Sequence, residues 1–479
     1  MRSSISFILD GKVREIDFER ERLSPTTTVL NYLRSLPSHK GVKEGCAEGD
    51  CGACTVVIAE TGGDDKLRYK SVDSCLLFLP MLHGKQLITV ENLRNDSGEL
   101  HPVQSAMVET GGSQCGFCTP GIVMSLFALY KKCGHPSRDE IEEALGGNLC
   151  RCTGYKPIVE AAARACVHGG MDHFSGDEPR ILELLISIPN QSITLATGRQ
   201  QYFRPVSPGE AVTLKHRHPE AIVICGATDI ALRVTKNHEV LKEVIDLSGV
   251  EELKEIVETG SSISIGAGVT LNEIMPRTKI TLPALHNMLS VFGSQQIRNL
   301  ATLGGSLGTA SPIGDALPVL IAYGARAVLE SLNGRREVAL DEFVTGYRTT
   351  VRKDDELITA VVIPKLLNGA RVKSYKISKR KDLDISTLSA GFRLELDGGD
   401  AVKAVRLVYG GMAEKTKGAA AAERFLVGKK WHRQTVEEAM KYIDSDFTPI
   451  SDARSGAEFR KVAARNLLLR FFEETKTAD

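Results

Sequence analysis

The sequence predicts an α+β protein of several domains, and four observations lead to that prediction. The chain has 479 residues, enough for about two to four domains of about 150 residues each. Residues 1–92 contain short runs of strand-like alternation, whereas residues 101–166 favour helices. From about residue 201 strand and helix patterns alternate. From about residue 370 three strand candidates precede two helices, which indicates a C-terminal α+β domain with an antiparallel sheet.

Charge and composition exclude several classes of function. Lys plus Arg and Asp plus Glu both count 60, so the formal net charge is zero. This balance argues against general binding to nucleic acid or to membrane surfaces. The start carries no apolar signal segment, and no apolar run approaches the ~18–20 residues that a membrane span needs. We therefore expect a soluble, cytoplasmic protein, and its 11 cysteines, an odd number, argue against a full disulfide framework.

The first 92 residues are expected to form a β-grasp, ferredoxin-like domain. Residues 4–18 alternate around Asp10-Gly11, which is a type I′ turn signal for a β-hairpin. A helix is expected after Thr28, and further strands are expected at 56–58 and 87–90.

A cysteine motif lies within this domain. Cys46, Cys51 and Cys54 follow the pattern C-x4-C-x2-C, and Cys75 comes after 20 intervening residues. This is the plant-type spacing in which four thiolates hold a [2Fe–2S] cluster. Structural zinc usually takes cysteine pairs from two separate knuckles, so the cluster is favoured over zinc. Three glycines of the same loop would let the backbone approach the sulfur atoms: Gly45, Gly49 and Gly52.

Two further cysteine pairs are expected at helix ends. Cys115 and Cys118 lie in QCGFCTPG, and Cys150 and Cys152 lie in NLCRCTGY. Four thiolates from two tight turns suit either zinc or a second [2Fe–2S] cluster, and the spacing alone leaves the two nearly even. The neighbouring cluster favours a second cluster, because two clusters in series conduct electrons and a lone zinc does not. The remaining cysteines are expected to be buried thiols: Cys133, Cys166 and Cys225.

A glycine-rich stretch follows in the second half of the chain. Ala301 to Asp315 (ATLGGSLGTASPIGD) offers many N–H and hydroxyl donors, which suit a phosphate-bearing cofactor. It also matches the G-x-S-x-G pattern of hydrolases around Ser306. We reject a hydrolase, because no clear helix follows Ser306 and no triad partners are evident.

Two C-terminal patterns complete the survey. The run KISKRK, Lys376 to Lys381, is open to three interpretations: a localisation signal, a solvated face, or a lysine that faces a cofactor. The last expected helix, 456–474, carries an apolar stripe that we interpret as core: Phe459, Val462, Ala463, Leu467 and Phe471.

Taken in this order, the motifs EGCAEGDCGACT, QCGFCTPG with GNLCRCTGY, and TLGGSLGTASPIGD resemble a known family. The whole chain is similar to the iron–sulfur/FAD small subunits of bacterial xanthine dehydrogenases, in the molybdenum hydroxylase family. The resemblance implies a [2Fe–2S] ferredoxin-like domain, a helical [2Fe–2S]-binding bundle, and an α/β FAD-binding domain of the CO-dehydrogenase-flavoprotein/vanillyl-alcohol-oxidase type. The expected domain ranges are 1–92, 93–166, a linker at 167–200 without periodicity, 201–368 for FAD, and a C-terminal flavoprotein domain at 369–479.

The resemblance also assigns the residues of the cofactor sites. Cluster 1 would take the first four cysteines and cluster 2 the second four. Tyr347 and Arg348 would lie near the nicotinamide entry. The family has Asn at the position of Ser306, and animal enzymes have an acidic residue at Leu383. The FAD contacts would come from Val223, Ile224, Cys225, Gly226, Ala227, Thr228, Asp229, Ile230, Phe292, Thr302, Leu303, Gly304, Gly305, Ser306, Thr309, Asp315, Ile358 and Lys376.

The function implied by the resemblance is electron transfer. Electrons would pass from a molybdenum cofactor on a partner through cluster 2, cluster 1 and FAD to NAD⁺, during oxidative hydroxylation of hypoxanthine and xanthine to urate. A flavin belongs between one-electron clusters and a two-electron acceptor. No residue of this chain would act as acid, base or nucleophile on the purine. A molybdopterin-binding large subunit is expected as partner, in an α2β2 assembly. Two alternatives stay open: the same subunit of a hydroxylase for aldehydes or other N-heterocycles, and a non-catalytic zinc scaffold.

Overall fold

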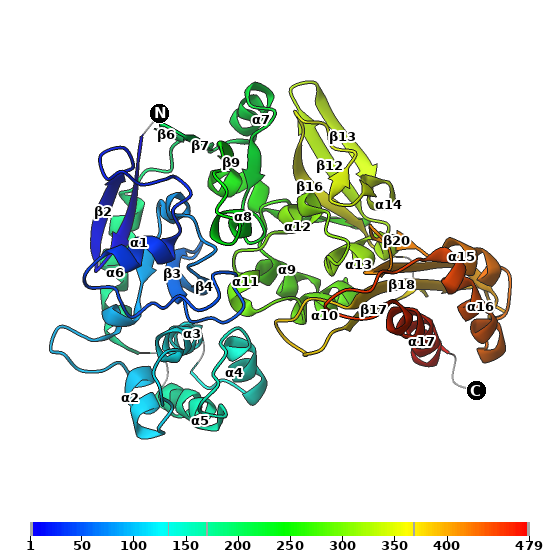
Figure 1. Ribbon diagram of the computed structural model, residues 1–479, viewed down its shortest axis with the longest axis horizontal. Coiled ribbons are helices and arrows are strands. Elements are labelled where there is room, and N and C mark those ends of the chain that lie inside the picture. Colours follow the sequence, from blue (N-terminus) through cyan, green and yellow to red (C-terminus); the bar gives the residue numbers. More distant parts are fainter. Residues whose placement is uncertain (1–2, 133, 169–170, 367–368, 477–479) are drawn as a thin grey trace. The chain divides into compact units, whose positions relative to one another are not determined.

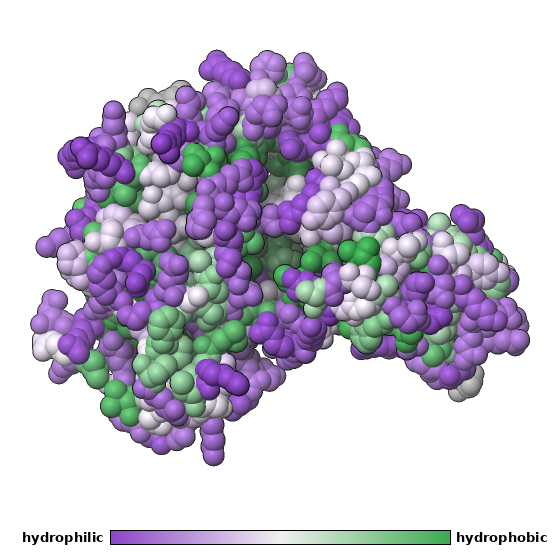
Figure 2. Space-filling model, in the orientation of Figure 1, coloured by the Kyte–Doolittle hydropathy of each residue, from purple (hydrophilic) through white to green (hydrophobic). Residues whose placement is uncertain are grey.

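The computed structural model describes residues 3–132, 134–168, 171–366 and 369–476 (Figure 1). The chain divides into two compact units. Unit 1 consists of Met1–Leu214, Glu220–Glu251 and Ser294–Ala301, and unit 2 of Lys215–Pro219, Glu252–Gly293 and Thr302–Asp479. Among the described residues, no helix is long and apolar enough to cross a membrane. The face drawn in Figure 2 is mostly hydrophilic, with its hydrophobic residues in small groups.

Unit 1 begins with a five-stranded sheet of the order β2-β1-β5-β3-β4, in which only β1 and β5 run parallel. Asp10 and Gly11 have φ values of 55° and 66°, so both adopt the left-handed conformation that a type I′ hairpin requires. Thr28 caps the expected helix by accepting a hydrogen bond from the backbone N–H of Asn31. The elements are β1 (Ser4–Leu9), β2 (Lys12–Asp17), α1 (Val29–Ser35), β3 (Thr55–Thr61), β4 (Leu67–Asp73), η1 (Leu79–Leu82), β5 (Gln86–Ile88) and η2 (Val90–Leu93).

Four helices follow, in a range that the sequence predicts to be helical. Helix α3 is apolar on every side and is buried from Gly121 to Tyr130, so it serves as the centre of this part. Its side chains share one core with strands of the sheet, where Phe127 lies with Ile8 and Val57. The helices are α2 (Pro102–Glu109), α3 (Thr119–Lys132), α4 (Arg138–Leu145) and α5 (Lys156–Ala165), and the short η3 (Cys166–His168) follows.

The range 167–200 contains regular structure where the sequence suggested a linker without periodicity. Helix α6 (His173–Ile186) begins at Asp172, whose side chain accepts a hydrogen bond from the backbone N–H of Ser175. Ile181 and Leu185 are buried, which anchors the helix to the core. The weak apolar pattern and Pro179 concealed this helix in the sequence. The domain boundaries themselves stay predictions.

A four-stranded sheet of the order β6-β7-β9-β8 completes unit 1, with β7, β9 and β8 parallel. Cys166 is buried, as expected, but Cys225 at the end of β8 is only half-buried, and Cys133 lies outside the described residues. The elements are β6 (Ile193–Thr197), β7 (Gln200–Arg204), β8 (Ile222–Ile224), α8 (Ala231–Thr235), β9 (Glu243–Asp246), η4 (Leu247–Gly249) and α11 (Gln295–Arg298). Two further elements have residues in both units: α7 (Pro208–Arg217) and η5 (Glu251–Lys254).

Unit 2 begins with an antiparallel sheet of the order β10-β11-β16-β12-β13. Helices pack beside it, and a small hairpin of β14 and β15 follows. The elements are β10 (Ile256–Glu258), β11 (Ser262–Gly266), α9 (Leu271–Thr278), α10 (Pro283–Ser290), α12 (Leu303–Thr309), α13 (Ala316–Tyr323), β12 (Arg326–Ser331), β13 (Gly334–Ala339), α14 (Leu340–Phe343), β14 (Val344–Gly346), β15 (Thr349–Thr350) and β16 (Leu357–Pro364).

The C-terminal part of unit 2 is an antiparallel sheet of the order β17-β18-β19-β20 (Figure 1). Phe392 and Gly391 point to opposite faces of β18: Phe392 packs against Phe471, whereas Gly391 lies against the backbone of Pro318 in α13. The elements are β17 (Arg371–Ile377), β18 (Leu388–Leu396), β19 (Val402–Gly410), β20 (Lys417–Gly418), α15 (Ala420–Leu426), α16 (Arg433–Asp446) and α17 (Ala457–Thr475).

The predicted apolar stripe of α17 is wrong at two of its five positions. Phe459 and Val462 are 53% and 40% exposed, whereas the other three residues of the stripe are buried. The buried face of α17 is rotated toward Arg460, Ala464 and Leu468. Arg460 is charged, yet it is only 2% exposed, because its Nη2 donates to both carboxylate oxygens of Asp452, at 3.0 and 2.8 Å.

The first testable prediction concerns Asp172. Its carboxylate accepts hydrogen bonds from His101 Nε2 (3.0 Å) and Lys131 Nζ (2.8 Å), and its side chain is 1% exposed. Burial raises the pKa of Asp172, but the hydrogen bonds from His101 and Lys131 outweigh it, so the pKa lies below its usual value. The ion pair therefore stabilises the fold above the unfolded-state pKa of about 4, and this stability is lost as the pH falls through the depressed pKa.

We expect Asp172→Asn to lower the free energy of unfolding by about 3 kcal/mol at neutral pH, because it removes one partner of a buried pair. The difference from the wild type should shrink as the pH falls below about 4. Thermal melting of both chains across this pH range measures the effect. Asp177→Asn on the same helix is the control, since the pair of Asp177 with Arg180 is exposed and contributes less than about 0.5 kcal/mol. Equal losses of unfolding free energy in the two variants would contradict a stabilising role for the buried pair of Asp172.

Candidate functional site

The first cysteine set lies on a loop between α1 and β3, with the fourth cysteine after β4. Cys46 Sγ accepts hydrogen bonds from the backbone N–H groups of Glu48 (3.4 Å) and Asp50 (3.3 Å). A hydrogen bond from the Cys51 thiol, helped by these N–H groups, lowers the pKa of Cys46 to about 5. A thiolate is the form that binds metal. Cys54 is paired in the same way with Cys75.

The second cysteine set comes from two turns at helix ends. Cys115 and Cys118 precede α3, and Cys150 and Cys152 lie between α4 and α5. The Sγ atoms of Cys152 and Cys115 are 3.7 Å apart, and the thiols of Cys118 and Cys150 are hydrogen-bonded to each other. Tyr155 holds the second turn by accepting the backbone N–H of Cys150 at 2.7 Å.

This two-by-two pairing fits [2Fe–2S] clusters, in which each iron takes two protein ligands. In tetrahedral coordination with metal–sulfur bonds of about 2.3 Å, two sulfur atoms lie about 3.8 Å apart. The Cys115–Cys152 separation of 3.7 Å agrees with that edge. Within the described part of the chain, no group of three His, Cys, Asp or Glu side chains is arranged to hold one metal ion. The pairing of the thiols is the observation that fits two metals per set.

The two sets differ in exposure. Cys54 and Cys75 are 2% and 1% exposed, whereas Cys115 and Cys152 are exposed. The second set also lies among exposed apolar side chains, with Phe117 48% exposed. One pair of the first set is therefore buried while its other pair, Cys46 and Cys51, is half-buried, and one pair of the second set faces outward.

A buried carboxyl beside the first set was missed in the sequence. Asp73 is 1% exposed, its Oδ1 lies 3.6 Å from Cys54 Sγ, and its Oδ2 has no hydrogen-bond partner among the described residues. Burial, followed by the negative charge of Cys46, raises the pKa of Asp73 to about 8. In the sequence, the indication that this carboxyl lies near the first set is its position two residues before Cys75.

The first flavin segment of the sequence analysis, Val223 to Ile230, lies in unit 1 as a strand, a tight turn and the start of α8. Ala227 has a φ of 58°, and a Cβ on Gly226 would lie 1.8 Å from the carbonyl oxygen of Leu300. Only glycine fits at that position, because the two backbones touch. Small residues in this turn leave its backbone uncovered, and backbone N–H groups are what a phosphate-binding turn needs.

The second flavin segment lies in unit 2 and is helical where the sequence suggested a loop. Thr302 caps α12 by accepting the backbone N–H of Gly305 at 3.1 Å, and Gly304 packs directly on Ala267. Three glycines in seven residues hid this helix. The expectation that no helix follows Ser306 was wrong, because Ser306 lies inside α12. It does not lie at a turn from strand to helix, and this position argues against a hydrolase elbow.

Two of the predicted flavin residues form a buried ion pair in unit 2. Lys376 Nζ donates to Asp315 Oδ2 at 2.8 Å and to the carbonyl of Val291 at 2.9 Å, and the side chains of the pair are 5% and 7% exposed. Ser386 Oγ donates to the other oxygen of Asp315 at 2.5 Å. Phe292 follows Val291 directly and is half-buried. Of the three interpretations of the KISKRK run, an inward-facing lysine fits Lys376.

The remaining predicted residues of unit 2 lie on separate elements. Ile358, on β16, is 9% exposed and contacts the α12 backbone near Gly308. Tyr347 and Arg348 form the turn of the β14–β15 hairpin; Tyr347 is 64% exposed and Arg348 has a φ of 52°. Leu383 has a φ of 49° and is buried.

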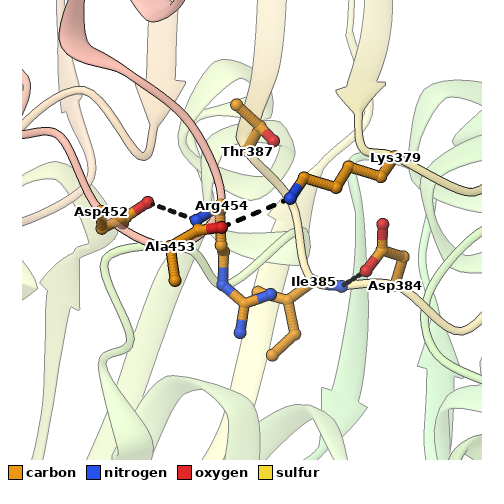
Figure 3. A pocket seen from close by; sticks show the side chains of 7 residues that line it. All are labelled: Lys379, Asp384, Ile385, Thr387, Asp452, Ala453 and Arg454. Carbon is orange, nitrogen blue, oxygen red and sulfur yellow. Dashed lines mark hydrogen bonds between the residues drawn. The ribbon is translucent and has the colours of Figure 1, made fainter.

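Unit 2 also contains a cavity of about 340 Å³ beside the strand that carries Lys376 (Figure 3). Lys379 Nζ donates to the carbonyl of Ala453 at 3.3 Å across it. Its two acids are already engaged, Asp384 with Arg380 and Asp452 with Arg460. The lining residues are Lys379, Asp384, Ile385, Thr387, Asp452, Ala453 and Arg454.

Comparison with protein families gives three matches along the chain. Residues 89–163 match a [2Fe-2S] binding domain, residues 197–366 the FAD binding domain in molybdopterin dehydrogenase, and residues 373–475 the CO dehydrogenase flavoprotein C-terminal domain. The chain therefore belongs to the iron–sulfur/FAD chains of the molybdenum hydroxylase family.

Among curated proteins, the chain is similar to xanthine dehydrogenases. It is 33% identical to that of Emericella nidulans over 98% of this chain and 38% of that protein. It is 31% identical to the xanthine dehydrogenase/oxidase of Gallus gallus, over 98% of this chain and 40% of that protein. The chain thus spans about two fifths of the length of these relatives. The bacterial origin suggested by the motifs stays a prediction.

Solved structures agree with the fold class. The carbon monoxide dehydrogenase of Hydrogenophaga pseudoflava aligns with a TM-score of 0.54 at 27% identity, over 58% of this chain and 96% of that chain. The quinoline 2-oxidoreductase of Pseudomonas putida 86 aligns with a TM-score of 0.53 at 26% identity, over 57% of this chain and 95% of that chain.

The second testable prediction concerns Gly45. A Cβ at this position would lie 2.7 Å from Cys51 Sγ, so Gly45→Ala should displace a predicted ligand of cluster 1. We expect this variant to lose iron and visible absorbance, because the sulfur has to move out of its tetrahedral position. Gly63→Ala is the matched control, since nothing lies within 4 Å of its Cβ position. Unchanged iron content in Gly45→Ala, measured by metal analysis, would count against the site.

The third testable prediction concerns Lys376. We expect Lys376→Met to lower the free energy of unfolding by about 3 kcal/mol, because it leaves the buried Asp315 without its partner. The flavin content should fall with it if Asp315 and Lys376 line the FAD site. Lys373→Met is the control, since Lys373 is 44% exposed and its ammonium group lies 3.9 Å from the carboxylate of Glu474, so its ion pair is weak. Melting temperature and flavin fluorescence measure the two effects, and full flavin content in Lys376→Met would remove these residues from the site.

Proposed function

We propose that this chain is the electron-transfer part of a xanthine dehydrogenase. Electrons would pass from a molybdenum cofactor on a partner chain through two [2Fe–2S] clusters and FAD to NAD⁺, while hypoxanthine and xanthine are hydroxylated to urate. The observation that carries the proposal is the pairing of eight cysteines, two by two, in a chain that also has an FAD-binding domain.

The residues of this chain would hold the cofactors and set their potentials. Clusters carry single electrons and FAD exchanges one or two, so FAD connects them to NAD⁺. The N–H groups of Glu48 and Asp50 donate to Cys46 Sγ and would stabilise added negative charge on the sulfur. The same role at Cys150 would fall to Thr153, whose hydroxyl donates to its Sγ at 3.2 Å.

The partner would cover the second cysteine set. Cys115 and Cys152 are exposed, and two apolar side chains next to the cysteines, Phe117 and Leu149, are 48% and 41% exposed. An exposed redox site with an apolar rim suits a docking surface for a redox partner. We assign this surface to the molybdopterin-binding chain, in an α2β2 assembly located in the cytoplasm.

The acceptor and the substrate are the finer parts of the proposal. NAD⁺ is supported by the similarity to xanthine dehydrogenases, and Tyr347 and Arg348 would lie at its entry. The similarity to carbon monoxide dehydrogenase and quinoline 2-oxidoreductase structures favours one alternative, a molybdenum hydroxylase for another substrate. The molybdopterin-binding partner would carry the substrate site and so would determine which substrate is oxidised.

The fourth testable prediction is a titration of the purified chain with NADH under anaerobic conditions. We expect broad iron–sulfur absorbance with flavin bands, and bleaching on addition of NADH. Xanthine should bleach the chain only when the molybdopterin chain is present. An aldehyde and quinoline serve as comparison substrates in the same assay.

Three outcomes would contradict parts of this proposal. Coloured protein that does not respond to NADH would exclude NAD⁺ as acceptor. Bleaching by quinoline or an aldehyde but not by xanthine would assign the chain to another hydroxylase. A colourless chain that contains zinc would overturn the whole proposal in favour of a zinc scaffold.

A further inference from the structure

The two cysteine sets are joined by one buried side chain, Asn148. It is 2% exposed and lies two residues before Cys150 of the second set. Its Nδ2 donates to the carbonyl oxygen of Gly52 at 3.0 Å and to Thr55 Oγ1 at 3.1 Å. Gly52 lies in the loop of the first set, directly after Cys51. The amide thus links the backbone of one set to the chain segment that carries the other.

The opposite end of the Asn148 amide is held equally firmly. Its Oδ1 accepts hydrogen bonds from Ser125 Oγ at 2.6 Å and from Gln296 Nε2 at 2.9 Å. Gln296 is fully buried and also donates to Ser125 Oγ at 2.8 Å. Both amide hydrogens and both acceptor positions of Asn148 are therefore occupied, and the side chain has a single orientation.

A backbone hydrogen bond runs beside this amide. The N–H of Leu149 donates to the carbonyl oxygen of Cys51 at 3.0 Å. Leu149 directly precedes Cys150, so this hydrogen bond connects Cys51 of the first set to the neighbour of Cys150 in the second set. The side chain of Asn148 and the N–H of Leu149 together form a double clamp on Cys51 and Gly52.

Three glycines make this approach possible. A Cβ on Gly52 would lie 2.3 Å from the carbonyl oxygen of Gly147 and 2.5 Å from Asn148 Nδ2. A Cβ on Gly121 would lie 2.1 Å from the carbonyl oxygen of Gly52, and one on Gly147 would lie 2.1 Å from Gln296 Oε1. A Cβ would clash at each of the three contacts, so the segments that carry the two sets are in direct contact here and cannot come closer.

We propose that Asn148 is a positioning residue that fixes the separation and orientation of the two [2Fe–2S] clusters, and that Gln296 holds Asn148 in place. The inference rests on the proposed function, in which both cysteine sets hold clusters. Asn148 contacts no ligand sulfur; it acts through the backbone of Gly52 and through its own link to Cys150. The loss of a contact outside the ligands typically lowers the metal affinity or the activity of a metal site by about 10- to 100-fold.

The test is the isosteric substitution Asn148→Asp in the full chain with its cofactors. The carboxylate would face the carbonyl of Gly52 without a hydrogen to donate, so the clamp should open while the ligands stay. Electron paramagnetic resonance of the dithionite-reduced chain reports the magnetic interaction between the two clusters, and a redox titration reports their midpoint potentials. We expect a smaller inter-cluster splitting and a shifted potential for cluster 2.

Asn190→Asp is the control. Asn190 also donates its amide to a backbone carbonyl, that of Gly249 at 3.4 Å, and neither residue belongs to a cysteine loop or to the segment that carries Gln296. It should keep the wild-type splitting and potentials. Gln296→Met keeps the side-chain length without the donor and should change the splitting in the same direction as Asn148→Asp. If Asn148→Asp loses a cluster altogether, Gln296→Met decides.

Wild-type splitting and potentials in both Asn148→Asp and Gln296→Met would overturn the positioning role. The same change in Asn190→Asp would overturn it too, because the effect would then be a general loosening of the fold. A wild-type chain without iron or without signals from two clusters would instead refute the proposed function, so the two failures are distinguishable.

Discussion

The arrangement within unit 1 depends on the buried hydrogen bonds of one short segment, Ser294–Ala301. Gln296 is fully buried and donates to Asn148, and Arg298, 1% exposed, forms an ion pair with Glu143. An amide or guanidinium buried without partners would cost several kcal/mol, so these side chains require their partners to be in place. The segment is distant in sequence from the cysteines, yet it packs against the parts that carry both sets. It makes the helical and ferredoxin-like parts interdependent.

The same segment also contacts the turn within Val223–Ile230, which we predict to contact FAD. The carbonyl of Leu300 lies against Gly226, and apolar residues of the turn share a core with the ferredoxin-like sheet. Beyond the turn, Lys236 Nζ donates to the carbonyl of Cys46 at 3.1 Å and lies 3.3 Å from the carboxylate of Glu48. A displacement of this turn would therefore also displace the loop that carries Cys46. Such rigidity suits an electron-transfer chain, whose rates depend on fixed distances between cofactors.

Sequence patterns predicted most elements of the fold but failed where local signals and tertiary contacts disagreed. The hairpin at Asp10-Gly11 and the cap at Thr28 were predictable, because turn and cap chemistry is local. Helix α12 was missed since its glycines weaken helix propensity, and the cap from Thr302 and the packing of Gly304 on Ala267 compensate for that. In α17, hydrophobicity favoured Phe459 for the core, whereas the buried ion pair of Arg460 rotates the helix the other way.

By itself, the sequence determined the types of ligand and the classes of domain, because cysteine spacing and helix or strand periodicity are properties of neighbouring residues. Only the tertiary structure decided which thiols pair and which distant polar groups meet. Asn148 and Gly52 are 96 positions apart, Gln296 and Asn148 are 148 apart, and Lys376 and Asp315 are 61 apart. No local pattern encodes such contacts, since each depends on where complete helices and strands pack. The positions and surroundings of the cofactors therefore belong to the fold, whereas their identities can be recognised in the chain.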